Sequence, residues 1–181
     1  MGASAPSGRS SLARVSLNPA LDEARFCPRC AAEAEVRHPR SIACPACGYQ
    51  AYYNPKPVAA AIPFDSDGNI WLLRRGPGLG EGKWTFPGGF VDLGESVPDA
   101  AHREAMEEME VELDLAELVG VYSRPEDRVV LVVYRATLRP GSVPAAGEEA
   151  TEVRAFGRGE LPWGELAFWS TERALRDAVS G

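Results

Sequence analysis

The acidic stretch GGFVDLGESVPDAAHREAMEEMEV, at residues 88–111, carries the most chemistry in this sequence. Glu104, Glu107 and Glu108 are spaced i, i+3 and i+4, so on a helix they fall within about 100° of one another on one face. Clustered carboxylates repel each other, and a divalent cation would offset that repulsion; Mg²⁺ and Mn²⁺ prefer such hard oxygen donors. Arg103, next to Glu104, can orient a carboxylate. A solvated acidic helix face gives the same pattern, so the helix alone leaves both interpretations open.

A second set of metal-ligand residues lies near the start of the chain. Cys27-Pro-Arg-Cys30 and Cys44-Pro-Ala-Cys47 are two CxxC pairs separated by thirteen residues. Zinc takes four such thiolates in a tetrahedron, and Gly48 allows the positive φ that a zinc knuckle often uses. We therefore expect a structural Zn²⁺ ligated by all four cysteines. Two unrelated thiol pairs or a redox CxxC are the alternatives, which the spacing disfavours.

The elements that must position these residues can be located from composition and periodicity. We expect a disordered tail at residues 1–22, rich in Ser, Ala, Gly and Pro, and a zinc ribbon at residues 23–53. The dipeptides Asn54-Pro55 and Lys56-Pro57 mark the start of a larger domain at residues 54–181. About 30 residues bury little surface, so zinc should supply folding energy to the ribbon. Its basic and acidic residues balance, which favours a structural role over nucleic-acid contact.

Within the larger domain, hydrophobic periodicity predicts strands and two helices in alternation. Strand-like runs occur at 57–64, 70–75, 85–91, 111–123, 128–138 and 151–156, with loops at 76–84 and 139–149. One helix runs from Val97 to about Met109, with Ser96 as N-cap and Pro98 in its first turn. An amphipathic helix at 166–179 closes the chain. Mixed strands with two helices predict a layered α/β domain.

Composition excludes several classes of function. The chain has 181 residues and a formal net charge of −7, from 26 acidic and 19 basic residues, whereas a non-specific nucleic-acid binder usually carries the opposite balance. No apolar run reaches 18 residues, so we expect no transmembrane helix and no membrane partner. The amino-terminal segment lacks a secretory signal, which predicts a cytoplasmic protein. Its Ser and Arg content leaves an organellar transit peptide as a minor alternative.

The acidic stretch resembles the Nudix box, G-x5-E-x7-R-E-U-x-E-E-x-G-U with U apolar. The match runs through Gly89, Glu95, Arg103, Glu104, Ala105, Glu107, Glu108 and Val111. Glu110 stands where the box has its last glycine, so either Glu110 is strained or the helix ends differently. The segments FCPRC…CPACG, YYNPKP, KWTFPGGFVDLGES and LPWGELAF extend the resemblance to the zinc-ribbon Nudix branch that includes FAD and ADP-ribose pyrophosphatases. This resemblance implies an α/β/α sandwich with a mixed sheet, preceded by a small zinc ribbon.

The resemblance also implies a mechanism, in which water attacks a phosphorus of a nucleoside diphosphate derivative with the help of Mg²⁺ or Mn²⁺. It assigns the metal shell to the Gly88 carbonyl, Glu95, Glu104, Glu107 and Glu108. Arg103 should hold Glu104, which serves as a further ligand or as a group that activates water.

Residues outside the box are assigned less directly. Glu149 and Glu152 match acidic positions of the FAD and ADP-ribose branch, and Glu152 is the preferred general base; both could instead be solvated loop acids. Arg74, Arg75 and Lys83 flank the glycine-rich loop and are candidates for phosphate contact, or simply surface residues.

The resemblance ranks the substrates: ADP-ribose or FAD first, NADH second and nucleoside triphosphates third. Pro125 resembles a downstream proline of ADP-ribose pyrophosphatases, whereas VYSRPEDRVV replaces the motif typical of NADH pyrophosphatases. Relatives are often dimers, so a homodimer is possible. A Nudix-derived ligand-sensing regulator and a zinc-ribbon nucleic-acid adaptor are the non-enzymatic alternatives. Regulators commonly lose box carboxylates, which are all present here, and the acidic charge disfavours an adaptor.

Overall fold

The computed structural model describes residues 16–180, and the chain divides into two compact units between Asn54 and Pro55. The predicted domain boundary, between residues 53 and 54, lies one residue earlier. Within residues 16–180, no helix is long and apolar enough to cross a membrane.

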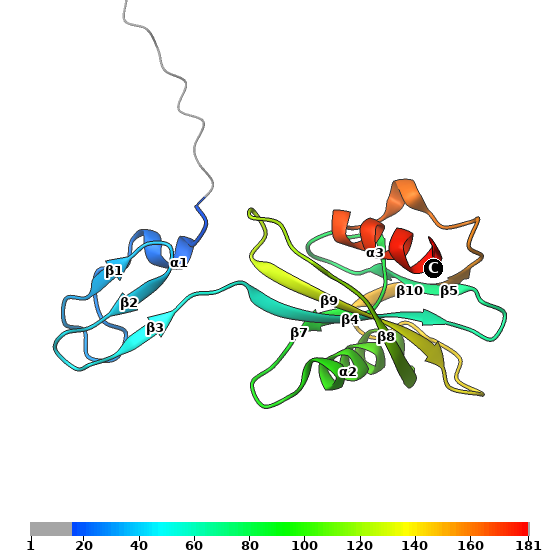
Figure 1. The fold of residues 1–181 in the computed structure, drawn as a ribbon, viewed down its shortest axis with the longest axis horizontal. Coiled ribbons are helices and arrows are strands. Elements are labelled where there is room, and N and C mark those ends of the chain that lie inside the picture. Colours follow the sequence, from blue (N-terminus) through cyan, green and yellow to red (C-terminus); the bar gives the residue numbers. More distant parts are fainter. Residues whose placement is uncertain (1–15, 181) are drawn as a thin grey trace, which may run out of the picture. The chain divides into compact units, whose positions relative to one another are not determined.

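The first unit is a small antiparallel sheet preceded by one helical turn (Figure 1). Its elements are α1 (Pro19–Asp22), β1 (Glu35–Arg37), β2 (Ser41–Ala43) and β3 (Gln50–Tyr52), with the sheet order β1-β2-β3. We expected disorder through residue 22. Residues 1–15 lie outside the described residues, but the expectation was wrong for α1, because Leu21 is buried and Asn18 Nδ2 donates to the Pro39 carbonyl at 2.9 Å.

The second unit is built on a seven-stranded mixed sheet. Its strands are β4 (Lys56–Phe64), β5 (Ile70–Arg75), β6 (Trp84–Thr85), β7 (Gly88–Phe90), β8 (Leu113–Tyr122), β9 (Val129–Leu138) and β10 (Ala150–Phe156). The order is β10-β5-β4-β9-β8, with β6 paired to β5 and β7 paired to β4. Only the β4–β9 pair is parallel, and the other pairs are antiparallel. The short β7 matters for the site, because it carries the two adjacent glycines beside β4.

Two helices cover opposite faces of this sheet, α2 (Val97–Met109) and α3 (Trp169–Ser180), as Figure 1 shows. Side chains of β4 alternate between the faces, as the two-residue period of a strand requires. Ala59 and Ala61 pack on the α2 side, whereas Ala60 and Ile62 join the core that contains Leu175 of α3. The result is the α/β/α sandwich with a mixed sheet that the resemblance implied.

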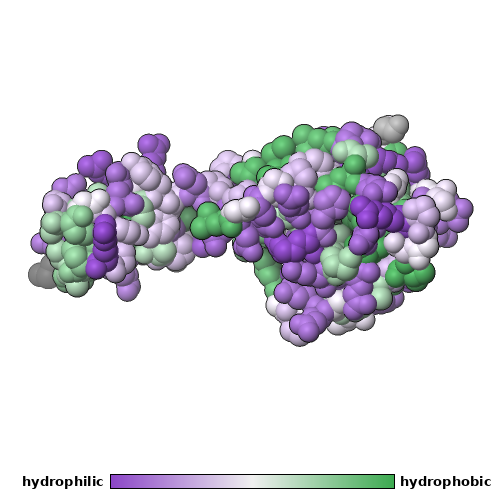
Figure 2. Space-filling view, turned by 90° about the horizontal axis from the view of Figure 1, so that it is seen from below, coloured by the Kyte–Doolittle hydropathy of each residue, from purple (hydrophilic) through white to green (hydrophobic). Residues whose placement is uncertain are grey.

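The predicted start of α2 is confirmed. Ser96 Oγ accepts from the Asp99 N–H at 3.3 Å, the Asp99 carboxylate accepts from the Ser96 N–H at 3.4 Å, and Pro98 lies in the first turn. These contacts satisfy N–H groups that a helix start leaves without partners. Seen from the α2 side, the surface of the second unit is mainly hydrophilic (Figure 2).

The closing helix begins later than predicted. It starts at Trp169 rather than at residue 166, after the 3₁₀ turn η1 (Trp163–Glu165). Leu166 forms a bridge to Trp84 of β6, and the Ala167 N–H donates to the Trp84 carbonyl at 2.9 Å. These three-dimensional contacts hold residues 166–167 extended, so the helical period of the sequence could not reveal the true start.

Candidate functional site

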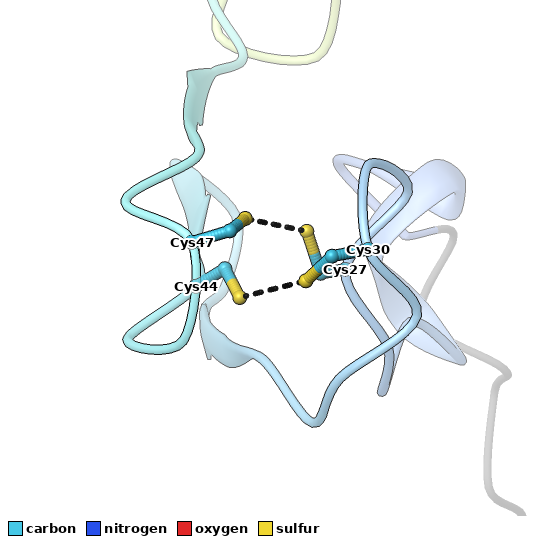
Figure 3. A group of neighbouring side chains, drawn as sticks. All are labelled: Cys27, Cys30, Cys44 and Cys47. Atoms are coloured by element: carbon cyan, nitrogen blue, oxygen red, sulfur yellow. Dashed lines mark hydrogen bonds between the residues drawn. The ribbon is translucent and has the colours of Figure 1, made fainter.

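The four cysteines of the first unit converge on one point, from two turns that face each other (Figure 3). Cys27 Sγ lies 3.7 Å from Cys47 Sγ, and Cys30 Sγ lies 3.6 Å from Cys44 Sγ. All four sulfur atoms lie within 4.8 Å of one another. Zinc–sulfur bonds of about 2.3 Å in a tetrahedron separate the sulfur atoms by about 3.8 Å. The cysteines are therefore positioned to form a zinc site.

The two cysteine turns share one backbone design. The Ala31 N–H donates to the Cys27 carbonyl at 2.9 Å, and the Gly48 N–H donates to the Cys44 carbonyl at 3.0 Å. Ala31 and Gly48 both have positive φ, 60° and 70°. The predicted positive φ at Gly48 is confirmed. The equivalent conformation at Ala31 went unpredicted, because alanine carries no signal for it.

In the second unit, β7 lies against the carboxylates of α2. The Gly88 N–H donates to Glu108 Oε2 at 2.8 Å, and a Cβ on Gly89 would overlap the carboxylate of Glu104. The glycine pair therefore permits a close approach that other residues would block. Glu108 is only 4% exposed, and its burial raises the pKa of that carboxyl to about 7. Burial also raises the pKa of Glu104.

Arg103 connects the acidic groups around it. Its Nη1 donates to Glu104 at 2.7 Å and to Glu107 at 3.0 Å, and its Nη2 donates to the Phe90 carbonyl at 2.9 Å. Its Nε and Nη2 bind the two oxygens of Glu95 at 3.2 and 2.8 Å. These hydrogen bonds lower the pKa of Glu95 and raise the pKa of Arg103. Arg103 thus fixes one side of the carboxylate cluster and joins it to β7.

A second acidic segment faces α2 from the loop before β10. Together the two elements enclose a pocket of about 310 Å³, lined by Glu104, Glu107, Glu108, Glu148 and Glu149. Arg103 balances only part of the charge of these five carboxylates, and such a concentration, with Glu108 buried and its pKa raised, is costly without further positive charge. Oxygen donors of this kind suit Mg²⁺ or Mn²⁺. The residues present therefore fit a divalent cation.

Four of these carboxylates, those of Glu104, Glu107, Glu108 and Glu149, also line a larger cleft of about 730 Å³. Phe168, Trp169 and Asp127 line it as well. Trp169 Nε1 donates to Asp127 Oδ2 at 2.9 Å, and the Arg124 guanidinium carbon lies 3.8 Å from the centroid of the Trp169 ring. Sequence reasoning missed these aromatic residues, because most aromatic side chains near a helix start simply pack in a core.

The arrangement of these elements agrees with the comparison by sequence. A family model described as the NUDIX domain matches residues 54–177, most of the chain. The chain belongs to the Nudix family.

Three Nudix relatives show how far the similarity extends. The chain is 30% identical over 139 residues to the NAD-capped RNA hydrolase NudC of Pseudomonas aeruginosa, covering 76% of this chain and 49% of that protein. It thus spans about half the length of the NudC relatives. It is 32% identical over 133 residues to the ADP-ribose pyrophosphatase of Methanocaldococcus jannaschii, covering 71% of this chain and 76% of that protein. The crystal structure of a NUDIX hydrolase from Nitrosomonas europaea superposes with a TM-score of 0.76 at 33% identity, covering 87% of this chain and 94% of that one.

Most of the Nudix box residues singled out from the sequence lie together. Gly88, Glu104, Glu107 and Glu108 all line the cleft. Both carboxylate oxygens of Glu95, which was expected to be a metal ligand, are instead hydrogen-bonded to protein groups. Its Oε1 accepts from the Asp92 N–H at 2.6 Å, and both of its oxygens bind Arg103. Its contacts are those of a residue that holds Arg103 in place.

Of the candidate site residues outside the Nudix box, some line the acidic pocket or the cleft and others do not. Glu149 lines the acidic pocket, whereas Glu152 lies on β10 with Oε2 3.5 Å from Arg74 Nε. The preference for Glu152 therefore has no geometric support. Arg75 lines the cleft, but Arg74 pairs with Glu152 and lies outside the residues that line it. Lys83 is exposed and also lies outside that set.

Proposed function

We propose that this Nudix protein hydrolyses the pyrophosphate bond of a nucleoside diphosphate derivative and depends on Mg²⁺ or Mn²⁺. One observation carries the proposal: five carboxylates from α2 and the 148–149 segment converge on a pocket that shares its walls with a cleft of about 730 Å³. Ligand pockets measure about 300–1,000 Å³, so a nucleotide derivative fits the cleft.

We assign two roles to the acidic residues of the site: binding the cation and accepting a proton from water. Glu104, Glu107 and Glu108 would hold the cation, which would polarise phosphoryl oxygens and make water more acidic. Arg103 keeps Glu104 and Glu107 in position and is itself held by Glu95. Glu149 faces the cluster from the opposite loop, and we assign it the role of accepting the proton of the attacking water. Arg75 also lines the cleft and is proposed to contact phosphate.

ADP-ribose or FAD is the proposed substrate. The relative from Methanocaldococcus jannaschii, named an ADP-ribose pyrophosphatase, supports this choice. Phe168 and Trp169 line the cleft and offer ring faces for a base or flavin. NADH is the second candidate, because the NudC relatives are named NAD-capped RNA hydrolases.

A substrate panel tests the proposal. The purified protein is incubated with ADP-ribose, FAD, NADH, diadenosine polyphosphates and dGTP, each with Mg²⁺ or Mn²⁺ and each with EDTA. We expect cation-dependent release of a nucleoside monophosphate from ADP-ribose or FAD at the highest kcat/KM. Binding of nucleotide or DNA without turnover of any compound would instead favour a sensor or an adaptor.

Neutralising the box carboxylates tests the site. Glu107→Gln combined with Glu108→Gln should lower kcat by about 10³-fold or more while the fold is kept, because the cation loses two anionic ligands. Circular dichroism checks the fold. Glu110→Gln is the matched control, since Glu110 ends the same helix and does not line the pocket. Retained turnover in the double variant would exclude this metal site.

The compartment and the oligomeric state can be proposed as well. Four thiols arranged for zinc favour a reducing environment, and we propose the cytoplasm. The homodimer expected from the family resemblance is checked by sedimentation of the purified chain.

A further inference from the structure

The loop that carries Glu149 is docked on the carboxyl end of α2 by main-chain hydrogen bonds. The Ala145 N–H donates to the Met109 carbonyl at 2.9 Å, and the Gly147 N–H donates to the Glu108 carbonyl at 3.1 Å. The last carbonyls of a helix have no partners within the helix, so they are natural acceptors for such a loop. The carbonyls used belong to the turn whose side chains form the acidic pocket.

Glu149 itself is held from the other side by the end of β5. The Gly76 N–H donates to the Glu149 carbonyl at 2.8 Å, and Gly76 is buried. The Ala150 N–H also closes a turn back to the Gly147 carbonyl at 3.2 Å. The main chain of residue 149 is therefore fixed between α2 and β5, while its exposed carboxylate lines the pocket.

Both contacts require glycine because of space. A Cβ on Gly147 would overlap the Glu107 carbonyl oxygen, and a Cβ on Gly76 would lie 2.9 Å from the Glu149 carbonyl oxygen. In each case the obstructing atom belongs to the main chain and cannot rotate away. Among the described glycines, the positive φ values belong to other positions, so alanine is excluded here by contact rather than by conformation.

We propose that Gly147 and Gly76 are positioning residues for the hydrolytic site, which hold Glu149 against the carboxylates of α2. This inference rests on the proposed function, since it gives Glu149 a part in the reaction. A side chain at either glycine forces the loop away from α2 or from β5. Glu149 then withdraws from the pocket, although no ligand and no charged side chain has been changed.

The experiment compares four single alanine variants of the full chain. Gly147→Ala and Gly76→Ala are the tests. Gly159→Ala and Gly164→Ala are the controls, because a Cβ at either position meets no atom within 4 Å and neither has a positive φ. Gly76→Ala displaces the loop from the opposite side, so it serves if Gly147→Ala fails to fold.

Two readouts are independent of turnover. Hydrogen exchange of the amides at 145–150 reports whether the loop stays docked, and titration with Mn²⁺ alone reports the charge collected in the pocket. We expect both test variants to lose protection in this segment and to bind Mn²⁺ about tenfold more weakly, in the range of changes seen when groups around a metal site are moved. The controls should match the wild type in both.

Kinetics then distinguish positioning from a general loss of stability. Each test substitution should lower kcat about tenfold or more with little change in KM, as expected when a group acting in the transition state is misplaced. In a Glu149→Gln background, the same substitution should lower kcat no more than about twofold further, because residues acting through one group are not additive. The inference would be wrong if the decrease in kcat of the double variant equalled the product of the decreases in the two single variants. It would also be wrong if the loop were undocked while kcat and Mn²⁺ affinity stayed unchanged.

Failure of the proposed function is distinguishable from failure of this inference. If the wild-type protein turns over no substrate, the proposed function is wrong. Exchange and Mn²⁺ binding would then still decide whether the two glycines hold Glu149 at the pocket, and unchanged values in both variants would refute that.

Discussion

Glu108 shows how one buried carboxyl can oppose stability. The residue is 4% exposed, and its carboxyl accepts a hydrogen bond from the Gly88 N–H. Burial outweighs that hydrogen bond and raises the pKa to about 7 from 4.5. Between these two values the folded protein holds a proton that the unfolded chain has lost. Without a divalent cation, stability therefore falls as pH rises from about 4.5 to 7.

Glu108→Gln should remove this dependence. The amide is neutral at every pH, so the variant should be more stable than the wild type by roughly 3 kcal/mol at pH 8 without divalent cations. Urea unfolding at several pH values measures the difference. Glu107→Gln is the control, because the Glu107 side chain is 59% exposed and its neutralisation should leave the slope in place. An unchanged pH slope in Glu108→Gln would contradict the assigned cause.

At the scale of the element, α2 ends at Glu110, whose backbone conformation is unfavourable for a residue with a side chain. Glu110 has φ 51° and ψ 37°, where the family pattern has glycine. The turn is still well formed, because the Glu110 N–H donates to the Met106 carbonyl at 3.1 Å and the Val111 side chain is buried. The helix therefore ends where a glycine would end it, and Glu110 carries the strain anticipated from the sequence.

Glu110→Gly should relieve this strain. Left-handed backbone costs a residue with a Cβ about 1–2 kcal/mol, and the greater freedom of glycine in the unfolded chain offsets part of it. We expect a gain of about 1 kcal/mol and a rise in Tm of about 3 °C. Glu117→Gly is the comparison, and we expect it to lower Tm, because Glu117 lies inside β8 and its φ is not positive. Equal effects from the two substitutions would show that the strain at Glu110 is not significant.

At the scale of the whole molecule, the chain has two units with separate means of stabilisation. Residues 55–181 have large apolar clusters on both faces of their sheet and contain every residue that lines the cleft. The first unit has few buried side chains, among them Leu21, Ile42 and two of the cysteines. Its folding should therefore depend on zinc, whereas the second unit should fold without it.

Cys44→Ser should separate the two units thermodynamically. We expect loss of bound zinc and rapid proteolysis within residues 23–54, while the unfolding transition of the second unit stays unchanged and kcat stays within about twofold. Metal analysis, limited proteolysis and calorimetry provide the measurements. Ala43→Ser is the control, because it adds a hydroxyl beside the site without removing a ligand. A second unit that melts earlier in Cys44→Ser would mean that the units are energetically coupled.

The sequence by itself determined the features that depend on short-range periodicity. The period of the helix put Glu104, Glu107 and Glu108 on one face, the residue types at Ser96 and Pro98 marked its start, and the cysteine spacing indicated zinc. The contacts between distant segments were decided only by the tertiary structure. Cross-strand pairing sets Glu152 opposite Arg74, whereas docking of the preceding loop on α2 brings Glu149 to the pocket.

The same distinction explains the contacts of Glu95 and the place of Trp169 in the cleft lining. Glu95 has the spacing of a metal ligand, but the fold brings Arg103 close enough to bind both of its oxygens. Trp169 reaches the cleft because the hydrogen bond from the Ala167 N–H to Trp84 of β6 keeps the residues before Trp169 out of α3. Asp127 then accepts a hydrogen bond from the Trp169 indole N–H. Spacing along a chain fixes which side chains share a face of one element. Which faces and loops meet depends on how the elements pack, and packing combines many long-range contacts that no local pattern encodes.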